Sequence, residues 1–206
     1  RPGAFAEYLV GSHRHMARKP ADLSWEEAAS LPLAAATALQ GLKDEGGLEA
    51  GQNVLIIGAS GGIGSLAVQM AKAQGAHVTG VCSTPNVELV RSLGADRVID
   101  YKREDFTRGD EQYDLVFQLG GTHGPRALRK VLAESGTLVQ CAGDGDRFLG
   151  PVRNVLVAMA MNRFVSQRLT LVNTREDTET LDAIRQMVEA GELRPVIDAT
   201  VPFEEA

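Results

Sequence analysis

The sequence predicts an α/β fold built on a doubly wound, parallel six-stranded sheet, and three observations support this prediction. Short apolar segments alternate with helical patterns from residue 53 to residue 172. The apolar segments are rich in Val, Ile and Leu without polar alternation, which is typical of parallel strands covered by helices on both faces. A glycine-rich turn joins the first strand to the first helix, where doubly wound sheets commonly carry one.

The strands of this sheet are expected at residues 53–57, 77–82, 97–101, 113–119, 137–141 and 168–172. Helices are expected between them at residues 65–74, 87–93, 125–133 and 152–165. Gly75 and Gly94 follow the first two helices, where glycine favours termination, and Pro125 opens the third, where proline is favoured. Six strands that alternate with helices are enough for a complete doubly wound sheet with right-handed crossovers.

The chain also contains segments that this sheet does not require. Ser24 and Glu27 have the spacing of a capping box, so a helix is expected to begin there. We further expect a short strand at residues 4–10, an Ala-rich helix at 34–42, a helix at 178–190 and an extended segment at 193–201. Because the chain begins with Arg1 and stops at what resembles a helix start, we expect a fragment cut at both ends.

Composition favours an ordinary soluble, cytoplasmic protein. The 206 residues are 44% apolar and 23% charged, and the net charge of −6 argues against nucleic acid or anionic lipid as the main partner. The two cysteines, Cys82 and Cys141, lie far apart inside apolar segments, so we expect free thiols in a reducing compartment. No apolar run approaches the roughly 18 residues of a membrane span, and no signal-peptide pattern is present.

The central motif is the turn at residues 58–65, which has the fingerprint form Ala59-x-Gly61-x-x-Gly64. A small residue at 59 permits the tight turn, Gly61 allows the backbone close to a pyrophosphate, and Gly64 allows the helix to pack against the strand. The helix start offers free N–H groups and a positive dipole end to the anion. The motif predicts a Rossmann domain that binds a dinucleotide. The alternatives are a turn that only packs and a cofactor site that has been lost.

The end of the second strand favours NADPH, with NADH possible. A site that prefers NAD places an acid about 20 residues after the glycines, but the chain has Ser83, Thr84 and Asn86 there. These side chains can hydrogen-bond to a 2′-phosphate, and further charge can come from Arg91, Lys102 or Arg103. The alternative is an ordinary polar turn before a helix.

The whole set of motifs resembles one family. The segments that carry the resemblance are residues 3–10, residues 24–42, the turn at 59–64 and residues 93–101. They resemble the medium-chain dehydrogenase/reductase superfamily, in its zinc-independent branch of quinone-oxidoreductase-like proteins and enoyl-reductase domains. The resemblance implies that residues 1–36 end a GroES-like catalytic domain, residues 37–174 form the Rossmann domain, and residues 175–206 return to the catalytic domain. The fold would thus include remnants of that GroES-like domain.

The resemblance also implies roles for individual positions. Thr37 matches a threonine close to the nicotinamide, and Tyr101 matches a tyrosine near the adenine phosphate. The pyrophosphate turn corresponds to Ser60, Gly61, Gly62, Ile63 and Gly64. The adenosine ribose corresponds to Ser83 and Thr84, and the loops near the nicotinamide correspond to Gly120, Cys141, Ala142 and Gly143. Two residues depart from the family: Asn86 replaces a common Lys or Arg, and Gln118 replaces an expected Asp or Asn.

A catalytic zinc is not expected. In zinc-dependent relatives a cysteine ligand lies shortly before the threonine, but residues 31–36 contain no Cys, His or acid. His13 and His15 have no third ligand nearby, so we interpret them as surface residues.

The resulting hypothesis is a zinc-independent NADPH-dependent oxidoreductase that transfers hydride to a quinone, an enone or another α,β-unsaturated carbonyl. No catalytic residue is assigned. The alternatives are a non-catalytic NADPH-binding sensor and an NAD-dependent alcohol dehydrogenase. An exposed sheet edge at residues 168–172 further suggests a homodimer, since relatives join two sheets there.

Overall fold

The computed structural model describes residues 10–141 and 166–202, and it confirms the predicted α/β fold. Six parallel strands form one sheet in the order β3-β2-β1-β4-β5-β6. The strands are β1 (Asn53–Ile57), β2 (His77–Cys82), β3 (Arg97–Asp100), β4 (Tyr113–Gln118), β5 (Leu132–Gln140) and β6 (Arg168–Leu171). The strand order reverses direction between β1 and β4, as in doubly wound sheets that bind dinucleotides.

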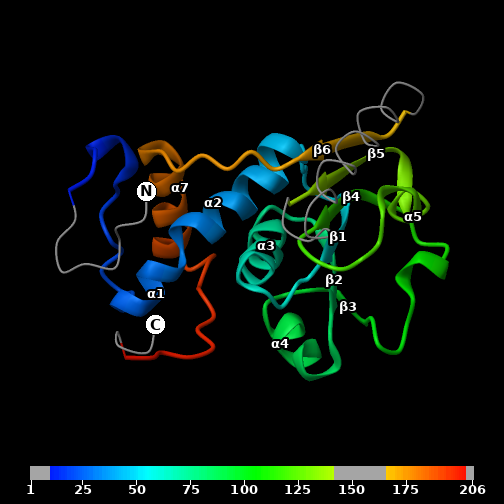
Figure 1. Ribbon diagram of the computed structural model, residues 1–206, viewed down its shortest axis with the longest axis horizontal. Coiled ribbons are helices and arrows are strands. Elements are labelled where there is room, and N and C mark those ends of the chain that lie inside the picture. Colours follow the sequence, from blue (N-terminus) through cyan, green and yellow to red (C-terminus); the bar gives the residue numbers. More distant parts are fainter. Residues whose placement is uncertain (1–9, 142–165, 203–206) are drawn as a thin grey trace.

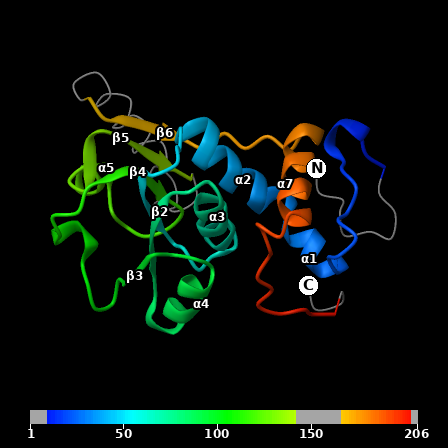
Figure 2. The ribbon, with the colours of Figure 1, turned by 180° about the vertical axis from the view of Figure 1, so that it is seen from behind.

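Helices cover the sheet and extend beyond it. They are α1 (Trp25–Ser30), α2 (Pro32–Gln40), α3 (Gly62–Ala73), α4 (Val87–Ser92), α5 (Pro125–Leu128) and α7 (Thr178–Glu189). The described residues also form short turns of helix: η1 (His13–His15), the π-helical η2 (Gly41–Glu45), η3 (Thr84–Asn86) and η4 (Phe106–Arg108). In Figures 1 and 2, α1 and α7 lie together to one side of the sheet, and α2 runs from them toward it. None of the described helices has the length and apolar character that a membrane crossing demands.

Both faces of the sheet are buried, which explains why its strands read as continuous apolar runs. Val54 and Ile56 of β1 belong to the cluster that faces α2, α3 and α4, whereas Leu55 and Ile57 belong to a second cluster on the opposite face. Alternate side chains of one strand therefore enter two separate cores.

The predicted capping box is confirmed at the start of α1. The Ser24 hydroxyl accepts the N–H of Glu27 at 3.1 Å, and the Glu27 carboxylate accepts the N–H of Ser24 at 2.8 Å. The next helix, α2, begins at Pro32 and runs without interruption past residue 37, so the domain boundary expected between residues 36 and 37 falls inside a helix.

The prediction of a helix at residues 125–133 and a strand at 137–141 was wrong in its boundaries. α5 ends at Leu128 and β5 begins at Leu132, with a register shift against β4. The cause is long-range pairing. The N–H of Tyr113 donates to the carbonyl of Val131 at 2.8 Å, and the buried Gln167 amide donates to the carbonyls of residues 129, 132 and 133. The helix predicted at 65–74 also begins earlier, at residue 62. Residues 193–201 form no strand. Of the strand predicted at 4–10 only residue 10 is described, and the helix predicted at 152–165 lies outside the described residues.

Candidate dinucleotide-binding site

The glycine-rich turn lies between β1 and α3, as predicted. Gly58 follows the strand with a φ of +88°, a left-handed conformation that glycine adopts without strain. The N–H groups of Gly58 and Ala59 both donate to the carbonyl of Val81 at 3.0 Å, which ties the turn to the end of β2. The left-handed conformation of the tight turn is therefore supplied by Gly58. Ala59, where the sequence predicts that a small residue is needed, is fully buried.

Three glycines of the motif differ in their surroundings. A Cβ at Gly64 would lie 2.1 Å from the carbonyl oxygen of Gly58, so the close packing of helix and turn requires glycine there. A Cβ at Gly61 would lie 3.4 Å from the same oxygen, an ordinary contact, and one at Gly62 would meet nothing within 4 Å. The protein's own packing therefore explains Gly64, tolerates a side chain at Gly61 in ordinary contact, and leaves open space beside Gly62.

The start of α3 faces this open space. Gly61 occupies the N-cap position, and no side chain caps the helix. The first N–H groups of a helix have no partner within it, and they stand at the positive end of its dipole. Both Gly61 and Gly62 are exposed. Uncapped backbone N–H groups next to open space can bind a phosphate group. This end of the sheet therefore suits a dinucleotide pyrophosphate.

The neighbouring strand β4 contributes a second glycine to the same end of the sheet. A Cβ at Gly58 would lie 3.5 Å from the backbone nitrogen of Gly120, so the two loops are adjacent. They follow β1 and β4, between which the strand order reverses. Crevices at such a reversal are where ligands bind in open α/β sheets.

Three polar side chains converge at the end of β2. The Asn86 amide nitrogen donates to the hydroxyl oxygens of Ser60 at 3.1 Å and Ser83 at 3.3 Å. All three residues are partly exposed. The sequence placed each of them in the cofactor site, and the structure brings them together as a small cluster of hydroxyl and amide groups suited to a ribose.

The adjoining residue Thr84 reveals an acid that the sequence argument did not consider. Its hydroxyl donates to the Asp100 carboxylate at 2.6 Å. Asp100 ends β3, and it is brought there because it pairs in register with Cys82 of β2. The pairing register of these two apolar strands is the signal that could have identified Asp100 as part of the site. Tyr101 follows Asp100 and is 55% exposed, so its ring is available to a ligand.

Of the three basic residues expected to add charge, two already have partners. Arg91 forms an ion pair with Glu88 on the exposed face of α4. The Arg103 guanidinium lies 3.5 Å from the Asp100 carboxylate. Lys102 and Arg103 are both exposed at the carboxyl end of β3.

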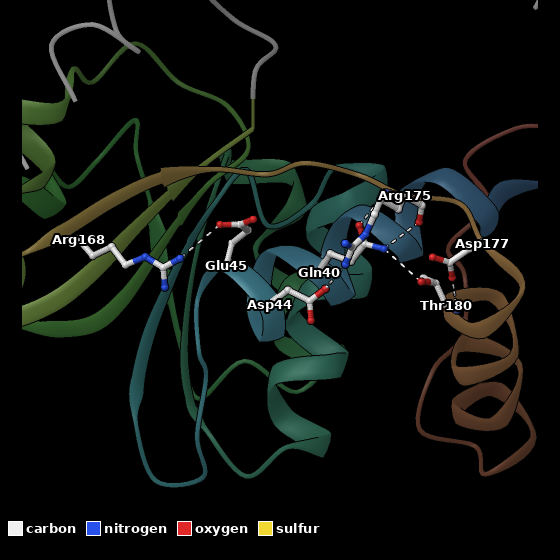
Figure 3. A network of polar contacts seen from close by, with 7 residues as sticks. All are labelled: Gln40, Asp44, Glu45, Arg168, Arg175, Asp177 and Thr180. Atoms are coloured by element: carbon white, nitrogen blue, oxygen red, sulfur yellow. Dashed lines mark hydrogen bonds and ion pairs between the residues drawn. The ribbon is translucent and has the colours of Figure 1, made fainter. Parts of the chain in front are cut away.

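Thr37 is buried in α2, and its hydroxyl is engaged with protein groups. It donates to the carbonyl of Leu33 at 2.7 Å and lies 3.0 Å from the hydroxyl of Thr174, just after β6. One turn along the helix, the Gln40 amide pairs with the backbone of Arg175 in both directions at 2.8 Å. Figure 3 shows this pairing together with the ion pair between Asp44 and Arg175. These contacts fix the path of the chain as it leaves β6 for α7.

A buried pair of glutamines explains Gln118, to which the sequence analysis assigns no role. The Gln140 amide donates to the Gln118 side-chain oxygen at 2.6 Å, and the Gln118 amide donates to the carbonyl of His123 at 3.0 Å. The pair joins the ends of β4 and β5 to the loop after Gly120. Cys141 follows β5, and burial raises the pKa of its thiol. Ala142 and Gly143 lie outside the described residues.

In the described segments 10–141 and 166–202, no three His, Cys, Asp or Glu side chains are grouped so that they could hold a metal ion. His13 and His15 are exposed, and one ring nitrogen of His15 lies 2.6 Å from the carbonyl oxygen of Glu176.

A polar cavity lies at the amino ends of the strands, with Asn53, His77 and Tyr113 in its lining. Burial and a hydrogen bond to Glu111 raise the pKa of Tyr113 to about 12, so its hydroxyl stays protonated at neutral pH. Because ligands of doubly wound sheets bind at the carboxyl ends, this cavity is not the dinucleotide site.

The chain is similar to known oxidoreductases in sequence and in fold. The sequence profile of a family described as zinc-binding dehydrogenase matches residues 93–206. The chain is 36% identical to tomato (Solanum lycopersicum) 2-methylene-furan-3-one reductase, over 98% of this chain and 46% of that protein. It is 36% identical to the mitochondrial NAD(P)H oxidoreductase RTN4IP1 of Mus musculus, over 100% of this chain and 57% of that protein. The quinone oxidoreductase of Coxiella burnetii superposes with a TM-score of 0.78 at 30% identity, over 92% of this chain and 57% of that one. The chain spans about half the length of the curated relatives it matches.

Proposed function

The chain belongs to the zinc-binding dehydrogenase family and is similar to a quinone oxidoreductase, and we propose that the intact protein is an NAD(P)H-dependent oxidoreductase. Its substrate is a quinone, an enone or another α,β-unsaturated carbonyl, and its preferred cofactor is NADPH, with NADH as the second. The observation that carries the proposal is the uncapped start of α3, where Gly61 and Gly62 are exposed and open space lies beside Gly62.

Each part of the site has a role in this proposal. The backbone N–H groups at the start of α3 hold the pyrophosphate, and the cluster of Ser60, Ser83 and Asn86 holds the adenosine ribose. The loop at Gly120 adjoins the nicotinamide. When bound, the nicotinamide supplies a hydride from its C4 atom. The chain contributes by holding the cofactor in a fixed position, so that a substrate bound in the neighbouring domain lies within reach of the transferred hydride.

We propose further that the reaction needs no zinc. The support comes from residues 31–36, where zinc-dependent relatives carry a cysteine ligand and this chain has only apolar and small residues. Hydrogen-bond donors then have to stabilise the negative charge that develops on the substrate oxygen.

The full-length protein tests these proposals. Consumption of reduced nicotinamide is followed by its absorbance with a panel of quinones and enones, before and after treatment with a chelator. We expect turnover that is faster with NADPH than with NADH and that survives chelation. No turnover with either cofactor contradicts the proposed activity, and loss of turnover after chelation contradicts zinc independence alone.

We also propose a homodimer joined through β6 and a cytoplasmic location. β6 is the terminal strand in the order of the described sheet, which makes its edge suited to pairing between two sheets. The free thiols Cys82 and Cys141 support a reducing compartment. Light scattering on the full-length protein distinguishes the dimer from a monomer, and a monomer at high concentration contradicts the pairing.

A further inference from the structure

Asp100 places a carboxylate at the adenosine end of the candidate site. Its side chain is only 10% exposed, and its oxygens accept the Thr84 hydroxyl at 2.6 Å and the N–H of Lys102 at 3.0 Å. The hydrogen bond from Thr84 holds the pKa of Asp100 below its usual range, with a smaller contribution from the positive charges of Arg103 and Lys102. Asp100 is therefore ionised at neutral pH.

The ionised carboxylate determines which hydrogen bonds Thr84 can make with a ligand. A threonine hydroxyl has one proton and two lone pairs. Because the Thr84 hydroxyl donates its hydrogen bond to Asp100, only its lone pairs remain, and these can accept a hydrogen bond from another partner. Thr84 is exposed, so these lone pairs are accessible. They can accept a hydrogen bond from a ribose 2′-hydroxyl, but they cannot donate one to a 2′-phosphate.

The charges near Thr84 also disfavour a 2′-phosphate. The Asp100 carboxylate repels a phosphate, and it also engages the Arg103 guanidinium at 3.5 Å, which reduces the attraction of that residue for an anion. Ser83 and Asn86, which are joined by a hydrogen bond, are neutral and do not offset this effect.

We propose that Asp100 is a positioning residue for cofactor specificity: through Thr84 it favours the free 2′-hydroxyl of NADH and disfavours the 2′-phosphate of NADPH. This inference rests on the proposed function. It implies that the acid which keeps NADH competitive in this protein comes from the end of β3, although no acid stands at the end of β2.

The variant Asp100→Asn tests the proposal with little disturbance of shape. Its amide oxygen can still accept the N–H of Lys102, while its amide nitrogen can donate to the Thr84 hydroxyl and release that proton for a phosphate. The ratio of the dissociation constant for NADH to that for NADPH, measured by calorimetry on the full-length protein, should rise about tenfold, which corresponds to about 1.4 kcal/mol. A thermal melt confirms that the variant is folded.

Two further variants identify the cause of the shift. Asp105→Asn makes the same charge change at an exposed acid that pairs with Arg108, and it should leave the ratio unchanged. In a Thr84→Val background, Asp100→Asn should shift the ratio by less, because the hydroxyl that transmits the effect is gone.

The outcomes separate this inference from the proposed function. An unchanged or lowered ratio in Asp100→Asn overturns the inference, and so does an equal shift in Asp105→Asn. A full shift in the Thr84→Val background overturns the action through Thr84. Failure of the wild-type protein to bind either cofactor overturns the proposed function as well.

Discussion

Replacing Gly64 by alanine should destabilise the protein strongly, because the new methyl group has no room. Its Cβ would lie 2.1 Å from the Gly58 carbonyl oxygen and 2.8 Å from the Ala59 Cα. Both are backbone atoms of the turn, so neither can rotate away, and α3 must move from β1. Overpacking of this kind costs about 3 kcal/mol. For a domain of this size, that loss lowers the Tm by about 6–12 °C.

Gly62→Ala is the matched control, since the same methyl group two residues earlier meets nothing within 4 Å. Alanine favours a helix over glycine by roughly 0.5–1 kcal/mol, so this variant should be as stable as the wild type or slightly more so. Thermal unfolding of both variants without cofactor makes the comparison. If Gly64→Ala melts at the same temperature as Gly62→Ala, the close approach of α3 to the turn is wrong.

Two other variants test contacts far from the candidate site. Gln167→Leu removes the buried amide that donates to three backbone carbonyls near β5. The free energy of unfolding in urea should therefore fall by about 1–3 kcal/mol. An unchanged unfolding midpoint would show that these carbonyls find other partners. Burial by itself raises the pKa of Asp96, but hydrogen bonds from Lys72 and from the N–H of Val78 outweigh it and lower the pKa. A lowered pKa in the folded state means that the stabilisation is present above the unfolded pKa of about 3.9 and is lost as the pH falls through the folded value. The stability of Asp96→Asn should therefore depend less on pH in this acidic range, and an identical pH profile by urea unfolding would contradict the assignment.

The fold could be predicted from the sequence because most of its signals are local. The apolar run before Gly58 and the glycines of the turn specify strand, turn and helix within some twenty residues of chain. Ser24 and Glu27 specify a helix start within four residues. Such features depend on neighbours in the sequence, and the structure confirms them.

The features that were missed depend on residues far apart in the chain. The boundary between α5 and β5 is set by Gln167 and Tyr113, which no local pattern connects to residues 129–133. Asp100 reaches Thr84 only because β3 pairs with β2 in a particular register. The occupied hydroxyl of Thr37 likewise requires Thr174, 137 residues later. In the last two cases a tertiary contact decides which polar groups remain available to a ligand.

The central claim is that the amides at the start of α3 hold a dinucleotide phosphate in the space left by Gly61 and Gly62. Calorimetric titration of the full-length protein and its Gly61→Ala variant with NADPH tests it most directly, because a Cβ at Gly61 meets the protein only in ordinary contact. We expect the variant to melt close to the wild type and to bind NADPH at least about tenfold more weakly, a loss of about 1.4 kcal/mol. Equal affinity in a folded variant would contradict the claim.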